Sequence, residues 1–305
     1  MDKKKRITIV GDGNVGSSIA LTLLLRNIGD ELVLVDPNAG KTKADSLDME
    51  HARYLIGSRT IIRQGDKKDY RDSDFIIVTA AGKAGPTSND RLLLLGQTKK
   101  ILTGILSDIK ESGFGGFLII VSNPVDIMTY YAYRMTWLKR NHVIGSGTLL
   151  DTARLNTIVA EEKGFEASEI SDLYMLGEHG LSAAGIYSNA SVSGSSLSLT
   201  SEEKNDFVSK TSTVGWEIIC GKGNTSYGIA ASVYRIIKAI LMDENTALPV
   251  SIVNEEETVS YSRLCLLNHN GIGSVLPLQM NPEESEKFRH SVESLKAICS
   301  TLMDE

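Results

Sequence analysis

The stretch ITIVGDGNVG, residues 7–16, decides the fold of this chain. Its β-branched start predicts a strand, and the apolar spacing that follows predicts a helix over about 14–28. Because Gly11 and Gly13 carry no side chains, the backbone can turn tightly and let a pyrophosphate approach the helix N-terminus, where free amides favour negative charge. Gly16 lets the helix pack closely on the strand. The stretch therefore predicts a dinucleotide-binding unit.

An acidic residue, Asp36, ends the second β-branched run at about the 20-residue separation at which an acid reaches the hydroxyls of an adenosine ribose. A carboxylate there would repel a ribose phosphate, so we expect NAD rather than NADP as the cofactor. The spacing alone leaves open the alternative that Asp36 is only a turn residue before Pro37.

The first half of the chain alternates short β-branched runs with helical patterns, which is typical of a parallel sheet wrapped by helices. Several runs are apolar at nearly every position, as expected for strands covered on both faces. The fold class is therefore α/β, with a Rossmann-type doubly wound parallel sheet. The expected strands are 7–10, 31–35, 60–63, 75–79, 117–121 and 142–144.

The pattern changes after about Gly147, where a helix is predicted from near Leu149, followed by a Ser/Gly-rich segment, 188–200, that could form short antiparallel strands. We expect an NAD-binding domain over 1–146 and an α+β catalytic domain over 147–305. No proline-rich linker separates them, so the cleft between them is the natural ligand site.

The last predicted helix has clear end signals and one apolar stripe. Asn281 can cap it, Pro282 suits its first position and Glu284 can close a capping box. Apolar residues at helical spacing predict core or subunit interface, namely Phe288, Val292, Leu295, Cys299 and Leu302.

Composition excludes several classes of protein. A net charge of -6 over 305 residues gives no field that would attract nucleic acid or anionic lipid. No apolar stretch approaches the roughly 20 residues that cross a bilayer, and the basic start MDKKKR is followed by no signal-peptide pattern. The three cysteines are widely spaced, so we expect no disulfide framework, no metal site and a cytoplasmic location.

Four polar residues in separate segments form a catalytic constellation: Asn123 in VSNPVD, Asp151 and Arg154 in GTLLDTAR, and His179 in LGEHG. Reduction of a 2-oxo acid needs a proton donor, a bidentate clamp for the carboxylate and a cation near the carbonyl. Taken singly, each residue has a structural alternative: a core histidine, a surface arginine, a helix cap. The other four histidines lie in segments without such catalytic residues and are interpreted as structural: His51, His142, His269 and His290.

The motifs GDGNVG, VSNPVD, GSGTLLDTAR, LGEHG and KGNTSYGIA, in this order and spacing, resemble the lactate/malate dehydrogenase family over essentially the whole chain. The resemblance is closest to the L-lactate and L-2-hydroxyisocaproate type enzymes. It implies that His179 is the acid/base, that Asp151 holds its tautomer and that Arg154 grips the substrate carboxylate. Arg91 would polarise the carbonyl when the preceding loop, 83–90, closes.

The remaining site residues are also implied by the resemblance. Asn123 would orient substrate and nicotinamide ribose, while Thr225 and Ile229 would line the substrate and nicotinamide pocket. The expected cofactor site comprises Gly11, Gly13, Asn14, Val15, Gly16, Asp36, Thr79, Ala80, Gly82, Asn123 and Ile229.

At the position that selects substrate in this family, the chain has Gly85 or Ala84, depending on the loop register. Malate enzymes have an arginine there and typical lactate enzymes a glutamine. A second substrate carboxylate would lack a partner, so we expect a 2-oxo or 2-hydroxy monocarboxylic acid with room for a longer side chain. Lys83 keeps a malate dehydrogenase as the alternative.

Two further expectations concern regulation and assembly. Fructose 1,6-bisphosphate activation in bacterial lactate enzymes uses an arginine and a histidine, whereas this chain has Asn156 and Tyr174, so no such activation is expected. The resemblance implies a homo-oligomer, a tetramer or a dimer. A non-catalytic NAD-binding sensor and a metal-dependent NAD glycosidase are the rival functions.

Overall fold

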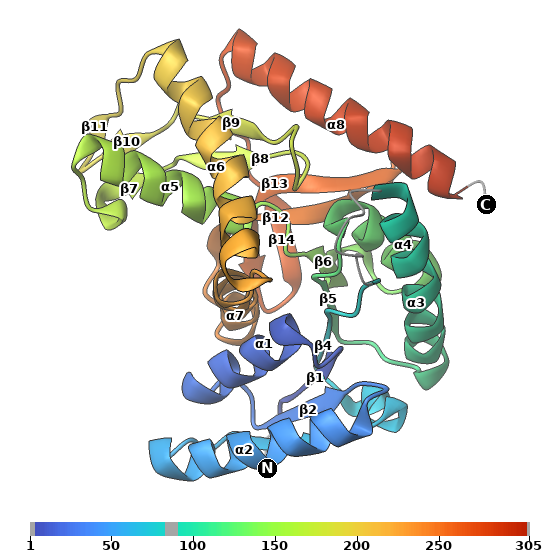
Figure 1. The fold of residues 1–305 in the computed structure, drawn as a ribbon. Helices are drawn as coiled ribbons and strands as arrows, with labels where there is room; N and C mark the ends of the chain where they lie inside the picture. The colour runs from blue at the N-terminus through green and yellow to red at the C-terminus, as the bar shows by residue number, and fades with distance from the viewer. Residues whose placement is uncertain (1–3, 83–90, 304–305) are drawn as a thin grey trace.

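A nine-stranded sheet runs through the molecule in the order β14-β13-β12-β6-β5-β4-β1-β2-β3 (Figure 1). The computed structural model describes residues 4–82 and 91–303, with the backbone alone for 91–94 and 301–303. Six strands are parallel, and they are the six that the sequence predicts, each within one residue of the expected bounds. They are β1 (Arg6–Val10), β2 (Glu31–Val35), β3 (Ile61–Gln64), β4 (Phe75–Val78), β5 (Phe117–Ile120) and β6 (Val143–Gly145).

The strand order reverses at β1. The chain builds outward from β1 through β2 to β3, then returns to place β4 on the other side of β1 and continues to β5 and β6. Val10 is therefore in register with Val35 on one side and with Val78 on the other. Ligands of open α/β sheets bind beyond the carboxyl ends of the strands at such a reversal.

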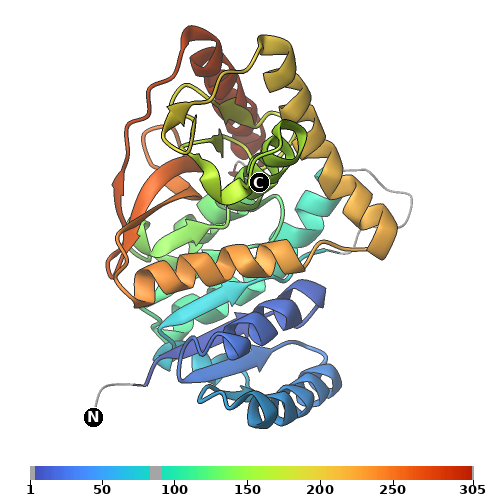
Figure 2. The ribbon, with the colours of Figure 1, turned by 90° about the vertical axis from the view of Figure 1, so that its left-hand side faces the viewer.

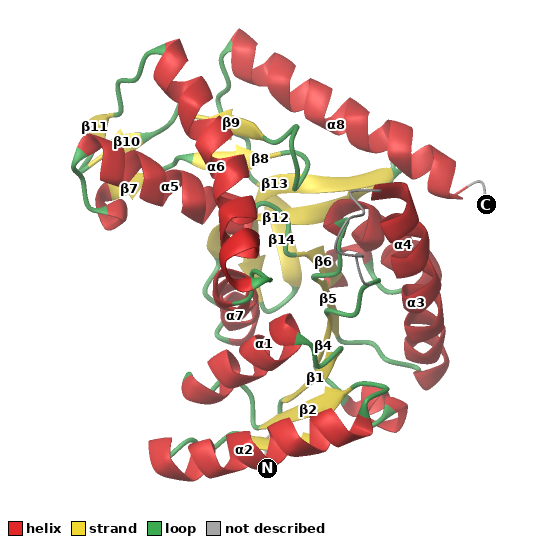
Figure 3. Ribbon diagram, viewed as in Figure 1, coloured by secondary structure: helices red, strands yellow, loops and turns green. Residues whose placement is uncertain are grey.

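Helices cover both faces of the sheet because alternate strand residues point to opposite sides (Figure 3). Ile9 and Ile77 pack in one core with α1 (Asn14–Leu25) and α7 (Tyr227–Leu241). Ile76 and Val78 pack in a second core with α3 (Arg91–Ser112) and α4 (Val125–Thr136). The helix α2 (Ala39–Ile56) follows β2, and a 3₁₀ turn, η1 (Lys67–Asp72), precedes β4. The expected doubly wound α/β class is confirmed.

Three antiparallel strands extend this sheet, and the sequence analysis missed them. They are β12 (Thr246–Asn254), β13 (Val259–Asn268) and β14 (Gly271–Val275). Ser251 of β12 pairs with Gly145 of β6, so the sheet is continuous between the two halves of the chain. Helix α7, also missed, runs alongside α1 (Figure 2). The packing of α7 on α1 therefore fixes the position of the glycine loop before α1 relative to the segment before α7.

The second half adds an α+β layer, as expected. Helix α5 (Leu149–Lys163) packs on α6 (Ser201–Lys222), and short strands flank them. The predicted meander is present: β10 (Ser191–Val192) pairs antiparallel with β11 (Ser195–Ser196) and with β7 (Ile170–Ser171). The hairpin of β8 (Tyr174–Leu176) and β9 (Ala184–Ile186) lies beside α8 (Pro282–Met303). The short 3₁₀ turns are η2 (Arg140–His142) and η3 (Ala167–Glu169).

The start of α8 confirms the predicted capping box. Asn281 Oδ1 accepts from the backbone of Glu284 at 2.9 Å, and Glu284 Oε2 accepts from the backbone of Asn281 at 3.2 Å. Val292, Leu295 and Cys299 pack into the second core, so this part of the stripe is core. The side chain of Leu302 lies outside the described residues.

Candidate active site

The imidazole of His179 lies against the carboxylate of Asp151, with Nδ1 2.5 Å from Oδ2. Asp151 is in the first turn of α5, and His179 lies between β8 and β9. The imidazole keeps 28% of its surface exposed, so another molecule can reach it. Because Nδ1 faces the carboxylate, Nε2 is the nitrogen left to exchange a proton with that molecule.

The charges of this pair stabilise each other. The negative charge of Asp151 raises the pKa of His179 to about 9, against the opposing effect of burial. Burial raises the pKa of Asp151, but the charges of His179 and Arg154 outweigh it, so this pKa falls below its usual range. The site can therefore hold a proton on the imidazole and release it to an oxygen that gains negative charge.

Arg154 lies one helical turn after Asp151 and donates from Nη1 to its Oδ1 across 3.2 Å. Helix α6 passes close to the guanidinium: a Cβ built on Gly215 would lie 3.2 Å from Nη1. A guanidinium presents several donors in one plane, so those directed away from Asp151 can pair with a carboxylate. A proton donor and a carboxylate clamp thus share one buried acid, Asp151.

A second buried acid, Asp126, supports His179, and the sequence analysis did not single it out. Asp126 Oδ2 accepts from the backbone N–H of His179 at 2.7 Å, and Oδ1 accepts from Ser251 Oγ at 2.6 Å. Burial raises the pKa of Asp126 to about 6, although both hydrogen bonds oppose the shift. The available signal was its place in VSNPVD, as an acid in the first turn of an otherwise apolar helix start.

The glycine loop has the shape that a dinucleotide needs. Gly11 has φ +103°, and a Cβ there would lie 2.7 Å from the backbone N of Ala80. A Cβ on Gly16 would lie 1.9 Å from Gly11 O, so the helix can approach the loop this closely only because residue 16 is glycine. Gly13, the N-cap of α1, has open space at its Cβ position and provides no side-chain cap. The first amides of α1 are thus free to bind an anion.

Asp36 follows β2 at the same edge of the sheet. Its Oδ2 accepts from the backbone N–H of Asp12 at 2.9 Å, and its Oδ1 accepts from the backbone N–H of Asn38 at 2.8 Å. These bonds fix the carboxylate beside the glycine loop. The alternative of a turn acid is partly right, because Asp36 also organises the turn that leads into α2.

The other predicted cofactor residues gather at the carboxyl ends of the strands or at helix starts. Thr79 and Ala80 follow β4, and Thr79 Oγ1 donates to Gly11 O at 2.7 Å. Gly82 donates from its backbone to Thr98 Oγ1 at 3.1 Å. Asn123 follows β5 and accepts from the backbone of Val125 at 3.3 Å. The first turn of α1 contains Asn14 and Val15, and the first turn of α7 contains Ile229. The predicted substrate residue Thr225 lies two residues before α7.

Part of the predicted site lies outside the described residues: Lys83, Ala84 and Gly85. Arg91 is the first residue of α3, and its side chain is likewise not described.

Comparison with known families matches residues 5–145 to "lactate/malate dehydrogenase, NAD binding domain" and residues 148–305 to "lactate/malate dehydrogenase, alpha/beta C-terminal domain". The chain belongs to the lactate/malate dehydrogenase family. Among its relatives in the family, the L-lactate dehydrogenases of Halalkalibacterium halodurans and Macrococcus caseolyticus are each 38% identical over 97% of both chains. The crystal structure of a minor L-lactate dehydrogenase from Enterococcus mundtii has a TM-score of 0.93, at 30% identity over 98% of this chain and 99% of the other.

Membership of this family makes the chain an NAD-dependent oxidoreductase that acts on the CH–OH group of 2-hydroxy acids. The residues present fit NAD. The open space at Gly13 and the free amides of α1 suit a pyrophosphate, and the carboxylate of Asp36 suits the two hydroxyls of an unphosphorylated ribose.

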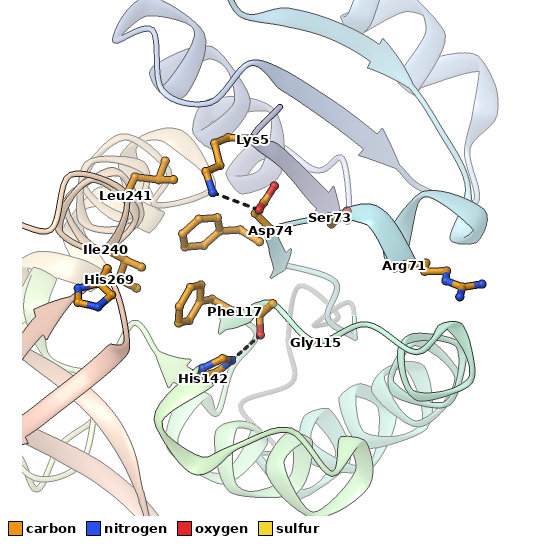
Figure 4. Close-up of a pocket in the computed structure, with 12 residues that line it drawn as sticks. Lys5, Arg71, Ser73, Asp74, Gly115, Phe117, His142, Ile240, Leu241 and His269 are labelled. Carbon is orange, nitrogen blue, oxygen red and sulfur yellow. Dashed lines mark hydrogen bonds and ion pairs between the residues drawn. The ribbon is translucent and has the colours of Figure 1, made fainter. Parts of the chain in front are cut away.

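A cavity of about 390 Å³, whose lining residues Figure 4 shows, lies at the amino ends of the parallel strands, opposite to the carboxyl ends that the glycine loop follows. It is lined by Phe75 and Phe117 at the amino ends of β4 and β5, and by His142, whose Nδ1 lies 3.1 Å from Gly116 O. The rings of His142 and Phe117 are tilted by 37° to each other, with their centroids 4.5 Å apart. These contacts agree with a structural role for His142.

Residues 4–82 and 91–303 contain no group of three or more His, Cys, Asp or Glu placed to hold a metal ion. None of the helices in these ranges has the length and apolar character needed to cross a membrane.

Proposed function

We propose that this dehydrogenase interconverts L-lactate, or an L-2-hydroxy acid with a longer side chain such as L-2-hydroxyisocaproate, with the corresponding 2-oxo acid. The observation that carries the proposal is the contact of one carboxylate, that of Asp151, with both the imidazole of His179 and the guanidinium of Arg154. The relatives named above are L-lactate dehydrogenases, which supports the same substrate class.

The proton is the part of the reaction that His179 would handle. When bound, reduced nicotinamide supplies a hydride to C2 of the 2-oxo acid. His179 would donate its Nε2 proton to the C2 oxygen as that oxygen gains negative charge, and it would take the proton back in the oxidative direction. Asp151 would keep Nδ1 protonated and stabilise the imidazolium, while Asp126 would hold the backbone of His179 in place.

Substrate orientation would come from several elements. Arg154 would bind the substrate carboxylate through paired hydrogen bonds, and Arg91 would polarise the C2 carbonyl. Asn123 would orient the substrate and the nicotinamide ribose from the end of β5. Thr225 and Ile229 would line the pocket at the start of α7, where Ile229 offers an apolar contact to the nicotinamide ring.

The substrate would carry one carboxylate, because neither Ala84 nor Gly85 could pair with a second. The second candidate function, a malate dehydrogenase, needs Lys83 to supply that pairing. Turnover of pyruvate, 2-oxoisocaproate and oxaloacetate with NADH separates the two. We expect pyruvate or 2-oxoisocaproate to be preferred, and a strong preference for oxaloacetate that Lys83→Met abolishes would establish the malate enzyme.

Consumption of NADH also tests the remaining alternative, a sensor that binds NAD without turnover. His179→Ala should remove most turnover and leave NADH binding largely intact. Equal turnover by the variant and the parent chain would contradict the assigned acid/base.

Three further properties are proposed with this function. The domain division is placed at 146/147, the assembly is a homo-oligomer, a tetramer or a dimer, and the location is cytoplasmic. Assembly is supported by large apolar side chains that α1 and α2 leave exposed, among them Leu25, Leu47, Tyr54 and Leu55. Sedimentation of the purified chain tests it, and a monomer at micromolar concentration would contradict it.

A further inference from the structure

Asp12 stands between the first two glycines of the cofactor loop, and its side chain is 0% exposed. Neither carboxylate oxygen has a hydrogen-bond partner among the backbone and side-chain groups that the structure describes. A buried polar group without hydrogen bonds is costly, and native structures contain few of them. The backbone N–H of Asp12 donates to Asp36, the acid expected at the adenosine ribose. The buried, unsatisfied carboxylate of Asp12 therefore lies next to the expected cofactor site.

The group that faces Asp12 is the ammonium of Lys41, in the first turn of α2. Lys41 Nζ lies 3.6 Å from Asp12 Oδ2 and also pairs with Asp45, one turn further along the helix. The lysine side chain is 38% exposed, so it bridges from the surface to the buried acid. Its positive charge is therefore enclosed between two carboxylates.

The charges of this cluster do not fully satisfy Asp12. Burial raises the pKa of Asp12 to about 6, the charge of Lys41 opposes that shift, and the carboxylates of Asp45 and Asp36 add to it. Partial burial opposes a rise in the pKa of Lys41, but hydrogen bonding and charge from Asp45 and Asp12 raise it. Lys41 therefore stays protonated, and its positive charge is paired with the carboxylates of Asp12 and Asp45.

The position of Lys41 makes this arrangement relevant to cofactor choice. The segment between the end of β2 and the first turn of α2 faces the adenosine ribose in dinucleotide-binding folds, and a cation there accommodates a 2′-phosphate. Lys41 is a cation in this segment, but the two carboxylates compete with any incoming phosphate for it. An ammonium freed from them could reach a phosphate, since its stem is flexible.

We propose that Asp12 is a second determinant of cofactor specificity, which acts with Asp36 by holding Lys41 away from a ribose phosphate. Asp36 would bind the ribose hydroxyls of NAD. Asp12 would keep the ammonium of Lys41, the cation of this cluster, from pairing with the 2′-phosphate of NADP.

The test compares NADPH and NADH binding in Asp36→Ser, in Asp36→Ser/Asp12→Asn, and in that double variant with Lys41→Met added. Dissociation constants come from nicotinamide fluorescence in the absence of substrate, so the result does not depend on which 2-oxo acid is turned over. Adding Asp12→Asn should tighten NADPH binding about tenfold, the effect of one charge-assisted hydrogen bond, and leave NADH binding nearly unchanged.

Lys41→Met should remove this gain, whereas Lys43→Met, at an exposed position of the same helix, should preserve it. The proposal is overturned if Asp12→Asn leaves NADPH binding unchanged, if it tightens NADH and NADPH equally, or if the gain survives Lys41→Met. If Asp12→Asn prevents folding, Asp45→Asn removes the other carboxylate that pairs with Lys41, and the same changes in NADPH and NADH binding are expected of it.

Discussion

The backbone N–H of His179 donates to Oδ2 of Asp126 across 2.7 Å, which ties the segment after β8 to the first turn of α4. Asp126 touches neither the imidazole nor the carboxylate of Asp151 through any bond described above. It fixes where the backbone of His179 lies, its charge helps to raise the pKa of His179, and Ser251 of β12 fixes Asp126 in turn.

Asp126→Leu should lower kcat about ten- to a hundredfold, because losing the acceptor lets the imidazole move away from its working position. Asp126→Asn is the matched control, since its amide oxygen can still accept from His179 while the hydroxyl of Ser251 turns to accept from the amide nitrogen. Steady-state kinetics beside thermal unfolding separates positioning from folding. A fully active Asp126→Leu chain would show that this bond does not position His179.

Asp151 sets the pH at which His179 works. Protonated imidazole is the donor for reduction, so kcat/KM for the 2-oxo acid should be constant below the pKa of about 9 and fall as pH rises through it. In Asp151→Asn the main cause of the raised pKa is gone, and the fall should move toward pH 6.5, the ordinary value for histidine. Asp206→Asn, an exposed acid on α6, is the control, and coincident profiles for parent and Asp151→Asn would refute the assignment.

Arg154→Lys keeps the positive charge but loses the planar pair of donors. We expect kcat/KM for the 2-oxo acid to fall about two to three orders of magnitude, with NADH affinity little changed. Arg235 lies on the second half of α7 and pairs with Glu244, and Arg235→Lys should leave the kinetics unchanged. An unaltered KM in Arg154→Lys would mean that the carboxylate binds elsewhere.

Fructose 1,6-bisphosphate should not activate the enzyme. Asn156 Nδ2 donates to the backbone carbonyls of Thr152 and Leu173, at 2.7 and 3.0 Å, and Tyr174 donates to Asp172 at 2.9 Å. Neither side chain brings a cation to the position where the sugar phosphates would bind. Titration of the bisphosphate at subsaturating substrate should leave the rate constant, and a saturable rise would disprove the expectation.

Local patterns predicted the parallel half of the fold because its strands are short runs rich in β-branched residues that alternate with helical patterns. The run in β12, TALPVSIVN, contains Pro249, and a proline within a run argues against a central strand. Asp126 was missed for a different reason. Its partner Ser251 is 125 residues away, so its burial depends on the packing of α4 against β12, which no spacing in the sequence shows.

The burial of Asp12, within the glycine motif GDGNVG, could not be predicted from sequence spacing either. The glycine pattern treats the residue between Gly11 and Gly13 as free to vary, whereas the structure buries its carboxylate against Lys41. Only the turn from β2 into α2 brings these two side chains together.

This burial has a measurable effect on stability. The native pKa of Asp12 is about 6, above its ordinary value of 3.8, so between these pH values the native state holds a proton that the unfolded state has lost. The free energy of unfolding therefore decreases as pH rises through this window. Asp12→Asn carries no charge at this position, so its free energy of unfolding should not decrease in this way. Its thermal unfolding midpoint should exceed that of the parent by about 2 °C or more at pH 7.5. At pH 4 the difference should be small, and the exposed Asp48→Asn should show no such trend. A midpoint difference that does not grow between pH 4 and 7 would mean that Lys41 compensates the buried charge completely.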